Sequence, residues 1–119
     1  MCIRDRPEGL DYKTYPAEIG VITDALATPL KVLKRGCVKA GETIAVFGAG
    51  GGLGIHMLMM AHWAGARVIA IDLSANKFDA CREAGADELV DATAENVTDA
   101  LLELTGGDGV DVALSLIQI

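Results

Sequence analysis

Short apolar runs alternate with longer helix-like segments from Thr43 to the end of the chain. Residues 43–47 and 67–71 are mostly apolar and rich in β-branched side chains, as expected for strands that are covered on both faces. Shorter segments continue this rhythm, and they predict strands at 88–90 and 110–113 and helices at 53–64, 74–84 and 97–104. Such alternation is typical of an α/β fold, a doubly wound parallel sheet with helices on both faces.

The ends and faces of two of these helices are also predicted. Ser74 is the expected N-cap of the helix at 74–84, and Gly85 is its expected stop. The helix at 53–64 is apolar on nearly every side, methionines included, which predicts that it is buried.

The segment before the first strand favours helix but is interrupted. Residues 17–35 carry apolar positions on both sides of Thr28-Pro29. Thr28 as N-cap with Pro29 in the first turn would give two short helices or one kinked helix.

A glycine-rich turn joins the first predicted strand to the following helix. The strict GxGxxG pattern is absent, but Gly48, Gly51 and Gly54 form GxxGxxG, with Gly50 and Gly52 between them. Glycines in this position let the backbone approach a pyrophosphate, whose charge the N–H groups of the helix N-terminus attract. Alternatives are a turn that serves only packing and a methyltransferase loop; the latter usually has an acid where Phe47 stands.

An acidic residue at the end of the second predicted strand indicates which dinucleotide is bound. Asp72 lies 24 positions after Gly48, close to the spacing of about 20 expected for a ribose-binding acid. A carboxylate accepts hydrogen bonds from both ribose hydroxyls of NAD and repels the 2′-phosphate of NADP. Leu73 follows it in place of an arginine. NAD is therefore the favoured cofactor.

Composition excludes several classes of partner. The 119 residues carry a net charge of −7, which argues against binding to nucleic acid or to an anionic membrane surface. Neither a membrane-spanning run nor a signal peptide is visible, so a cytoplasmic protein is expected. Cys2, Cys37 and Cys81 lack CxxC spacing, which predicts neither a disulfide framework nor a structural zinc site.

Both ends of the chain resemble translated sequencing adapter. Residues 1–6 match one strand of a transposase adapter used in short-read libraries, and residues 114–119 match its reverse complement with one substitution. We therefore expect a fragment of a longer protein whose sheet is truncated to about its first half. The expected division is an adapter-like tail at 1–6, a helical link at 7–42, a partial NAD-binding domain at 43–113 and a second tail at 114–119.

Six segments, in this order and spacing, resemble the zinc-dependent medium-chain alcohol dehydrogenases. They span residues 7–113 and read PEGLDY, DALATPL, VKAGETIAVFGAGGGLG, GARVIAIDLSANK, GADELVDA and LTGGDGVDVA. The resemblance implies a Rossmann-like fold and a parent enzyme that transfers a hydride between an alcohol and NAD with the help of zinc. Its substrates would be alcohols and the corresponding aldehydes or ketones, and the parent would be a homo-oligomer.

The resemblance also assigns roles to individual residues. The turn from Gly48 to Gly54 would wrap the pyrophosphate, while Asp72 and Lys77 would bind the adenosine ribose. Leu53 and Thr28 would lie beside the nicotinamide. Asp24 falls where the family places the third ligand of its catalytic zinc, and a carboxylate oxygen is an acceptable zinc ligand. The other zinc ligands would belong to an N-terminal domain that precedes this segment.

Two departures from the family keep other functions open. Leu30-Lys31 replaces the family's usual aromatic-histidine pair, and the extra glycine in the turn resembles the zinc-free quinone reductases. A zinc-independent quinone or enoyl reductase using NAD(P)H is therefore one alternative. A non-catalytic NAD-sensing Rossmann module is another.

Overall fold

Four parallel strands form one sheet at the centre of the molecule. The computed structural model describes residue 11 and residues 13–115. The strands lie in the order β3-β2-β1-β4, with all neighbours parallel. Their bounds are β1 Thr43–Phe47, β2 Arg67–Asp72, β3 Glu88–Asp91 and β4 Val112–Ser115. The predicted Rossmann-like α/β class is thus confirmed.

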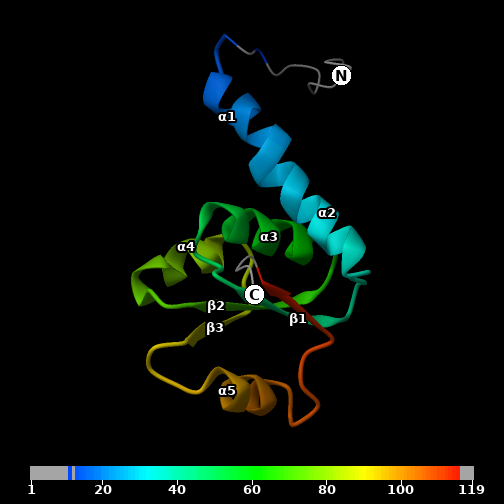
Figure 1. Ribbon diagram of the computed structural model, residues 1–119, viewed down its shortest axis with the longest axis vertical. Coiled ribbons are helices and arrows are strands. Elements are labelled where there is room, and N and C mark those ends of the chain that lie inside the picture. Colours follow the sequence, from blue (N-terminus) through cyan, green and yellow to red (C-terminus); the bar gives the residue numbers. More distant parts are fainter. Residues whose placement is uncertain (1–10, 12, 116–119) are drawn as a thin grey trace.

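Helices cover both faces of this sheet (Figure 1). On one face lie α3 (Gly52–Trp63) and α4 (Phe78–Glu83), together with α2 (Ala27–Arg35); α5 (Val97–Leu104) covers the other face. None of the helices within the described residues is long and apolar enough to cross a bilayer.

The central strands are apolar because they pack against helices on both sides. Alternate residues of β1 point to opposite faces, so Ile44 joins the cluster under α3 while Ala45 joins the cluster over α5. In β2, Val68 likewise packs in the cluster under α3, and Ile69 packs in the cluster over α5. All four side chains are fully buried. A continuous apolar run is therefore what this position in the sheet requires.

The helix predicted at 74–84 starts differently from the expectation. A 3₁₀ turn, η2 (Ala75–Lys77), precedes α4, and the Ser74 side chain caps neither helix. The backbone N–H of Ser74 instead donates to the carboxylate of Asp72 at 3.0 Å. The expected stop is present, because Gly85 has φ +104°, a conformation that favours glycine.

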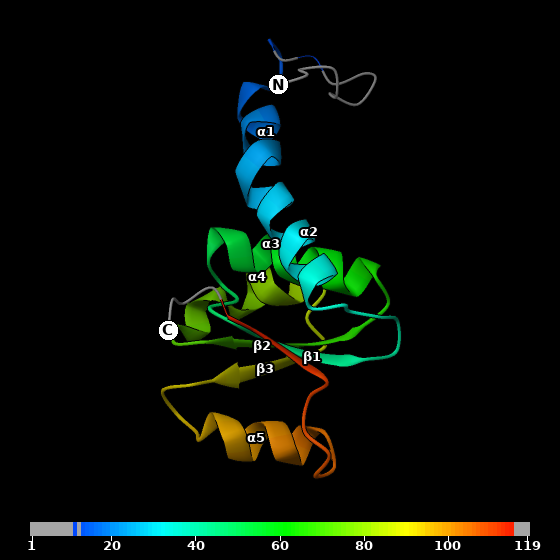
Figure 2. The ribbon, with the colours of Figure 1, turned by 45° about the vertical axis from the view of Figure 1, so that its right-hand side comes forward.

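Residues Pro16–Arg35 form one continuous helical rod that projects from the body (Figures 1 and 2). It consists of α1 (Pro16–Val21), a π-helical turn η1 (Ile22–Leu26) and α2. Proline in a helix lacks an N–H and crowds the carbonyl four residues earlier. Pro29 is the third residue of α2, so the carbonyl that its ring would crowd belongs to Ala25. Ala25 lies in the widened π turn directly before α2.

Thr28 is therefore not an N-cap, contrary to the sequence-based expectation. It lies inside α2, whose start has no side-chain cap, and its Oγ1 donates to Oδ1 of Asp24 at 3.2 Å.

The expectation that α3 is buried on all sides is wrong. Met57 and Leu58 are fully buried against the sheet, but Met59 is 49% exposed and Trp63 is 85% exposed. The outer face of α3 is thus apolar and accessible in the described part of the chain.

The last strand extends into the segment that resembles sequencing adapter. Leu114 and Ser115 belong to β4, where they lie in register with Val46 and Phe47. Leu114 is only 5% exposed and packs in the core under α3. Residues 1–6 and 116–119, the other adapter-like positions, lie outside the described residues.

We predict that Leu114→Ala lowers the free energy of unfolding by about 2–4 kcal/mol, because it removes a buried side chain and leaves a cavity. Leu102→Ala is the matched control: Leu102 is 41% exposed on α5, so its loss should cost less than about 1 kcal/mol. Urea denaturation followed by circular dichroism measures both. Equal losses in the two variants would contradict the place of Leu114 in the core.

Candidate functional site

The glycine turn lies at the carboxyl end of β1 and leads directly into α3. Gly48 has φ +70°, and its carbonyl accepts a hydrogen bond from Gly51 N at 3.1 Å. Gly51 is the N-cap residue of α3, in an extended conformation, and no side chain caps the helix. The first N–H groups of a helix have no partner within the helix, and they carry its positive dipole end. The turn therefore offers donors that suit an anionic group.

The glycines of this turn serve different purposes. A Cβ on Gly54 would collide with the carbonyl of Gly48 and lie 2.6 Å from that of Ala49, so the helix can approach the turn only without a side chain there. A Cβ on Gly52 would meet nothing within 4 Å. The space outside Gly52 is therefore open to a ligand, whereas Gly54 is needed for packing.

Asp72 ends β2 beside this turn, and its carboxylate is held by backbone donors. Oδ2 accepts from Gly50 N at 2.8 Å, and Oδ1 accepts from Ser74 N at 3.0 Å. The residue is only 7% exposed. A buried carboxylate is tolerated when it is paired and hydrogen-bonded, as it is here. Two of its roughly four acceptor positions remain for further donors such as ribose hydroxyls.

Lys77 lies over Gly50 and next to the carboxylate. Its Nζ is 3.7 Å from Oδ1 of Asp72, and its side chain remains 45% exposed. A Cβ built on Gly50 would lie 2.7 Å from Cβ of Lys77 and 3.1 Å from Oδ2 of Asp72. Gly50 must therefore be glycine because Lys77 and Asp72 occupy the space that a side chain would need.

The order of the strands places this cluster at the switch point of the sheet. From β1 the chain moves outward to β2 and β3, then returns to add β4 on the other side of β1. In open α/β sheets, ligands bind beyond the carboxyl ends of the strands where the order reverses. The glycine turn follows β1 at this end, and Asp72 is the last residue of neighbouring β2.

Cys81 of α4 is buried near the same carboxylate. Burial raises the pKa of its thiol, the negative charge of Asp72 raises it further, and Lys77 lowers it. The thiol is therefore held neutral, and we assign it to packing.

The remaining predicted site residues lie elsewhere. Asp24 and Thr28 are joined by their hydrogen bond on the helical rod, in η1 and α2. Leu53 is half-buried in the first turn of α3. Within residue 11 and residues 13–115, no three His, Cys, Asp or Glu side chains gather closely enough to hold a metal ion. Zinc ligation by Asp24 thus stays a prediction.

Two features of the site were not predicted. One is the backbone N–H of Ser74 as a donor to Asp72, and the other is the steric demand of Lys77 on Gly50. Aspartate side chains often accept a hydrogen bond from the backbone N–H two residues on, in an Asx turn, so Asp72 itself could have indicated the first. The second depends on a side chain 27 positions away from Gly50 and has no local signal.

Comparison with known proteins identifies the family of this chain. Residues 52–118, more than half of the chain, match the family described as zinc-binding dehydrogenase. An NAD-dependent alcohol dehydrogenase of Sulfurisphaera tokodaii is 28% identical over 100 residues, which cover 83% of this chain and 29% of that protein.

Solved structures show the same relationship. AibC has a TM-score of 0.81 at 35% sequence identity, and the match covers 90% of this chain and 31% of the AibC chain. An Escherichia coli quinone oxidoreductase complexed with NADPH has a TM-score of 0.69 at 28% identity, and the match covers 72% of this chain and 27% of the oxidoreductase chain. The chain therefore spans less than a third of the length of each of these relatives.

A parallel sheet in this order, with a glycine turn and an acid at its switch point, is the arrangement of a dinucleotide-binding domain. The chain belongs to the zinc-binding dehydrogenase family, within the medium-chain dehydrogenases and reductases.

We predict that Gly54→Ala destabilises the fold by about 1–3 kcal/mol, because the added methyl group collides with backbone carbonyls that cannot move independently. Gly52→Ala, two residues earlier in the same helix, should change the free energy of unfolding by less than about 0.5 kcal/mol, because its Cβ meets open space. Urea denaturation of both variants tests this. A Gly54→Ala protein as stable as Gly52→Ala would refute the packing role.

Proposed function

We propose that this chain is the NAD-binding part of an enzyme that transfers a hydride between an alcohol and NAD with the assistance of zinc. The observation that carries the proposal is the buried Asp72 carboxylate, held by Gly50 N and Ser74 N beside the uncapped start of α3. A carboxylate so placed favours the free ribose hydroxyls of NAD over the 2′-phosphate of NADP.

Each part of the site has a role in this proposal. The N–H groups at the start of α3 bind the pyrophosphate, and the open space outside Gly52 admits it. Asp72 accepts from the ribose hydroxyls, to which the exposed ammonium group of Lys77 donates. Leu53, in the first turn of α3, packs against the nicotinamide. These contacts orient the cofactor so that one face of its ring receives the hydride.

The helical rod would supply the residues nearest to the reaction. Asp24 is the proposed zinc ligand from this chain, and Thr28 fixes its Oδ1 by a hydrogen bond of 3.2 Å. When bound, zinc acts as a Lewis acid that stabilises the alkoxide form of the substrate. The remaining ligands would come from other parts of the parent protein. We further propose that the parent is a cytoplasmic homo-oligomer that acts on alcohols and the matching aldehydes or ketones.

A zinc-independent reductase is the second candidate. The turn Gly48–Gly54 has one more residue than GxGxxG, and a structural relative is a quinone oxidoreductase complexed with NADPH. Metal analysis of the purified full-length parent separates the two candidates: about one equivalent of zinc, lost in Asp24→Ala, supports the first, while a metal-free active enzyme supports the second.

We predict that Asp72→Ser weakens NAD binding by at least about tenfold, equivalent to about 1.4 kcal/mol, and that NADP binding weakens less or improves. The reason is that the variant loses both the ribose acceptor and the charge that repels the 2′-phosphate. Isothermal titration of the purified chain with NAD⁺ and with NADP⁺ measures the ratio of the two dissociation constants.

The matched control for this substitution is Asp79→Ser, which removes an exposed acid of α4 seven positions further on. It should leave both dissociation constants unchanged. A ratio that stays the same in Asp72→Ser would rule out the ribose-binding role of Asp72.

A further inference from the structure

The imidazole of His56 folds back over the first turn of α3. His56 lies four residues after Gly52, and its Nδ1 is 2.6 Å from the carbonyl oxygen of Gly52. A carbonyl oxygen only accepts hydrogen bonds, so Nδ1 carries a proton and donates it to this bond. The tautomer of the neutral ring is thereby fixed. Nε2 is left as a nitrogen that accepts a hydrogen bond when the ring is neutral and donates one when the ring is protonated.

The place of His56 on α3 puts its ring on the open side of the glycine turn. Side chains of a helix tilt toward its N-terminus, and residues four apart lie on the same face. His56 therefore shares the face of Gly52, where an added Cβ would meet nothing within 4 Å. The face of Gly54, by contrast, is filled by backbone carbonyls. The ring thus borders the space that the proposed function assigns to the pyrophosphate of the cofactor.

The charged side chains around the turn add no net positive charge to this space. Lys77 lies at the turn, but its Nζ is 3.7 Å from the carboxylate of Asp72, so the pair as a whole is neutral. The other basic residue between positions 48 and 77 is Arg67. It begins β2, at the opposite end of the strand from Asp72, and its guanidinium group donates to the carbonyl of Leu104 at 2.9 Å. Each phosphate of a dinucleotide is negatively charged, so a further cation at the turn would favour binding.

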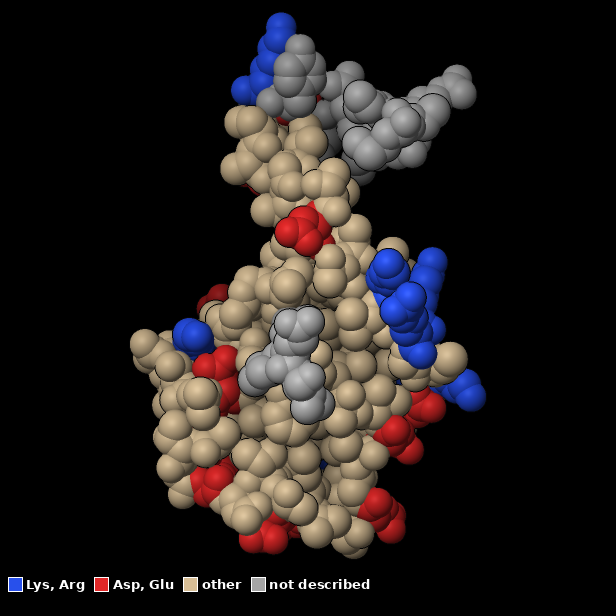
Figure 3. Space-filling model, in the orientation of Figure 1, with Lys and Arg blue, Asp and Glu red and all other residues tan. Residues whose placement is uncertain are grey.

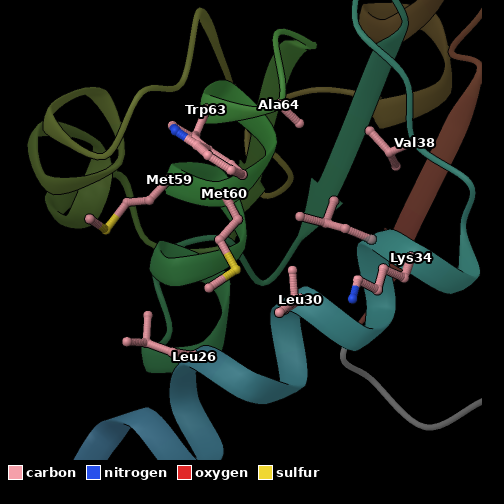
Figure 4. Close-up of a pocket in the computed structure, with 9 residues that line it drawn as sticks. Leu26, Leu30, Lys34, Val38, Met59, Met60, Trp63 and Ala64 are labelled. Atoms are coloured by element: carbon pink, nitrogen blue, oxygen red, sulfur yellow. The ribbon is translucent and has the colours of Figure 1, made fainter. Parts of the chain in front are cut away.

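The basic residues of α2 lie at the other edge of the sheet. Lys31, Lys34 and Arg35 occupy the second half of α2, and basic side chains gather over this helix in Figure 3. Lys34 lines an apolar hollow of about 750 Å³ between α2 and α3 (Figure 4). A Cβ built on Gly36, directly after α2, would lie 3.4 Å from Val112, the first residue of β4. The end of α2 is therefore at the amino ends of the strands, whereas the glycine turn follows the carboxyl end of β1.

We propose that His56 is a phosphate-binding residue of the dinucleotide site and that its ring takes up a proton from solvent when the cofactor binds. In the complex, Nδ1–H keeps its bond to the carbonyl of Gly52, and Nε2–H donates to an oxygen of the pyrophosphate. A neighbouring anion favours the charged form of a histidine, so proton uptake and cofactor binding strengthen each other. This inference rests on the proposed function, because it requires a dinucleotide at the start of α3.

Other titratable groups lie on the elements packed against α3, but they do not change charge in the same range of pH. Apart from the three basic residues of α2, these groups are Asp24 in η1, Arg67 and Asp72 in β2, and Asp79, Cys81, Arg82 and Glu83 in α4. In the part of the chain that the structure describes, none of them bonds to His56. Carboxylates, lysine and arginine ordinarily stay charged between about pH 6 and 8. Burial raises the pKa of the Cys81 thiol, which therefore stays neutral there.

Isothermal titration of the purified chain with NAD⁺, in buffers of different ionisation enthalpy, counts the protons taken up on binding. We expect uptake of up to about one proton, and an affinity that rises as the pH falls from about 8 to about 6. His56→Asn keeps an amide donor for the carbonyl of Gly52 but removes Nε2. It should abolish the proton uptake and weaken binding about tenfold at pH 6, with little change at pH 8. His62→Asn is the matched control, because it removes the other of the two histidines, in the last turn of α3, and should change neither quantity.

The possible outcomes separate this inference from the proposed function. A folded chain that binds no NAD⁺ would overturn both. Binding of NAD⁺ without proton uptake, or proton uptake that persists in His56→Asn, would overturn the role of His56 alone and leave the ribose-binding role of Asp72 in place. A loss of affinity in His56→Asn that is the same at pH 6 and pH 8 would also count against the inference, because it would indicate a purely structural role for the ring.

Discussion

The buried carboxylate of Asp72 is the interaction on which the rest of the site depends. A charge with 7% exposure must be compensated, and the chain does so with two backbone N–H groups and the ammonium group of Lys77. These partners come from the glycine turn, from the residues after β2 and from the 3₁₀ turn. One side chain thus joins the glycine turn to the two short segments that follow β2.

Several local features follow from this requirement. The N–H of Ser74 donates to Asp72, and the chain continues from there into the 3₁₀ turn before α4. Lys77 lies against Gly50, which excludes any larger residue there. Gly54 is required for a different reason: α3 begins so close to the carbonyls of Gly48 and Ala49 that no side chain fits there. The glycines are therefore fixed by the protein's own contacts as well as by any ligand.

The sequence was sufficient to predict the strands, the switch-point turn and the acid beside it, because these depend on local patterns. Buried parallel strands are apolar throughout, and a turn between strand and helix needs glycine. The π turn before Pro29 was not predicted, since proline alone is equally compatible with a break or a kink. Exposure of Trp63 was also missed, because periodicity shows that a face is apolar but not what covers it.

Residues Leu114 and Ser115 show the same limit: their resemblance to adapter sequence says nothing about whether they can pair with β1.

The hydrogen-bond donors around Asp72 also suggest how cofactor preference can change during evolution. Two N–H groups and one ammonium group converge on a single point, which is the environment of an anion-binding nest. The protein fills this nest with an anion of its own. A mutation that removes the acid leaves the donors in place and without an acceptor, ready to receive a phosphate from outside. Under the proposed ribose-binding role of Asp72, preference for one dinucleotide over the other would depend on whether the negative charge at this point belongs to the chain or to its ligand.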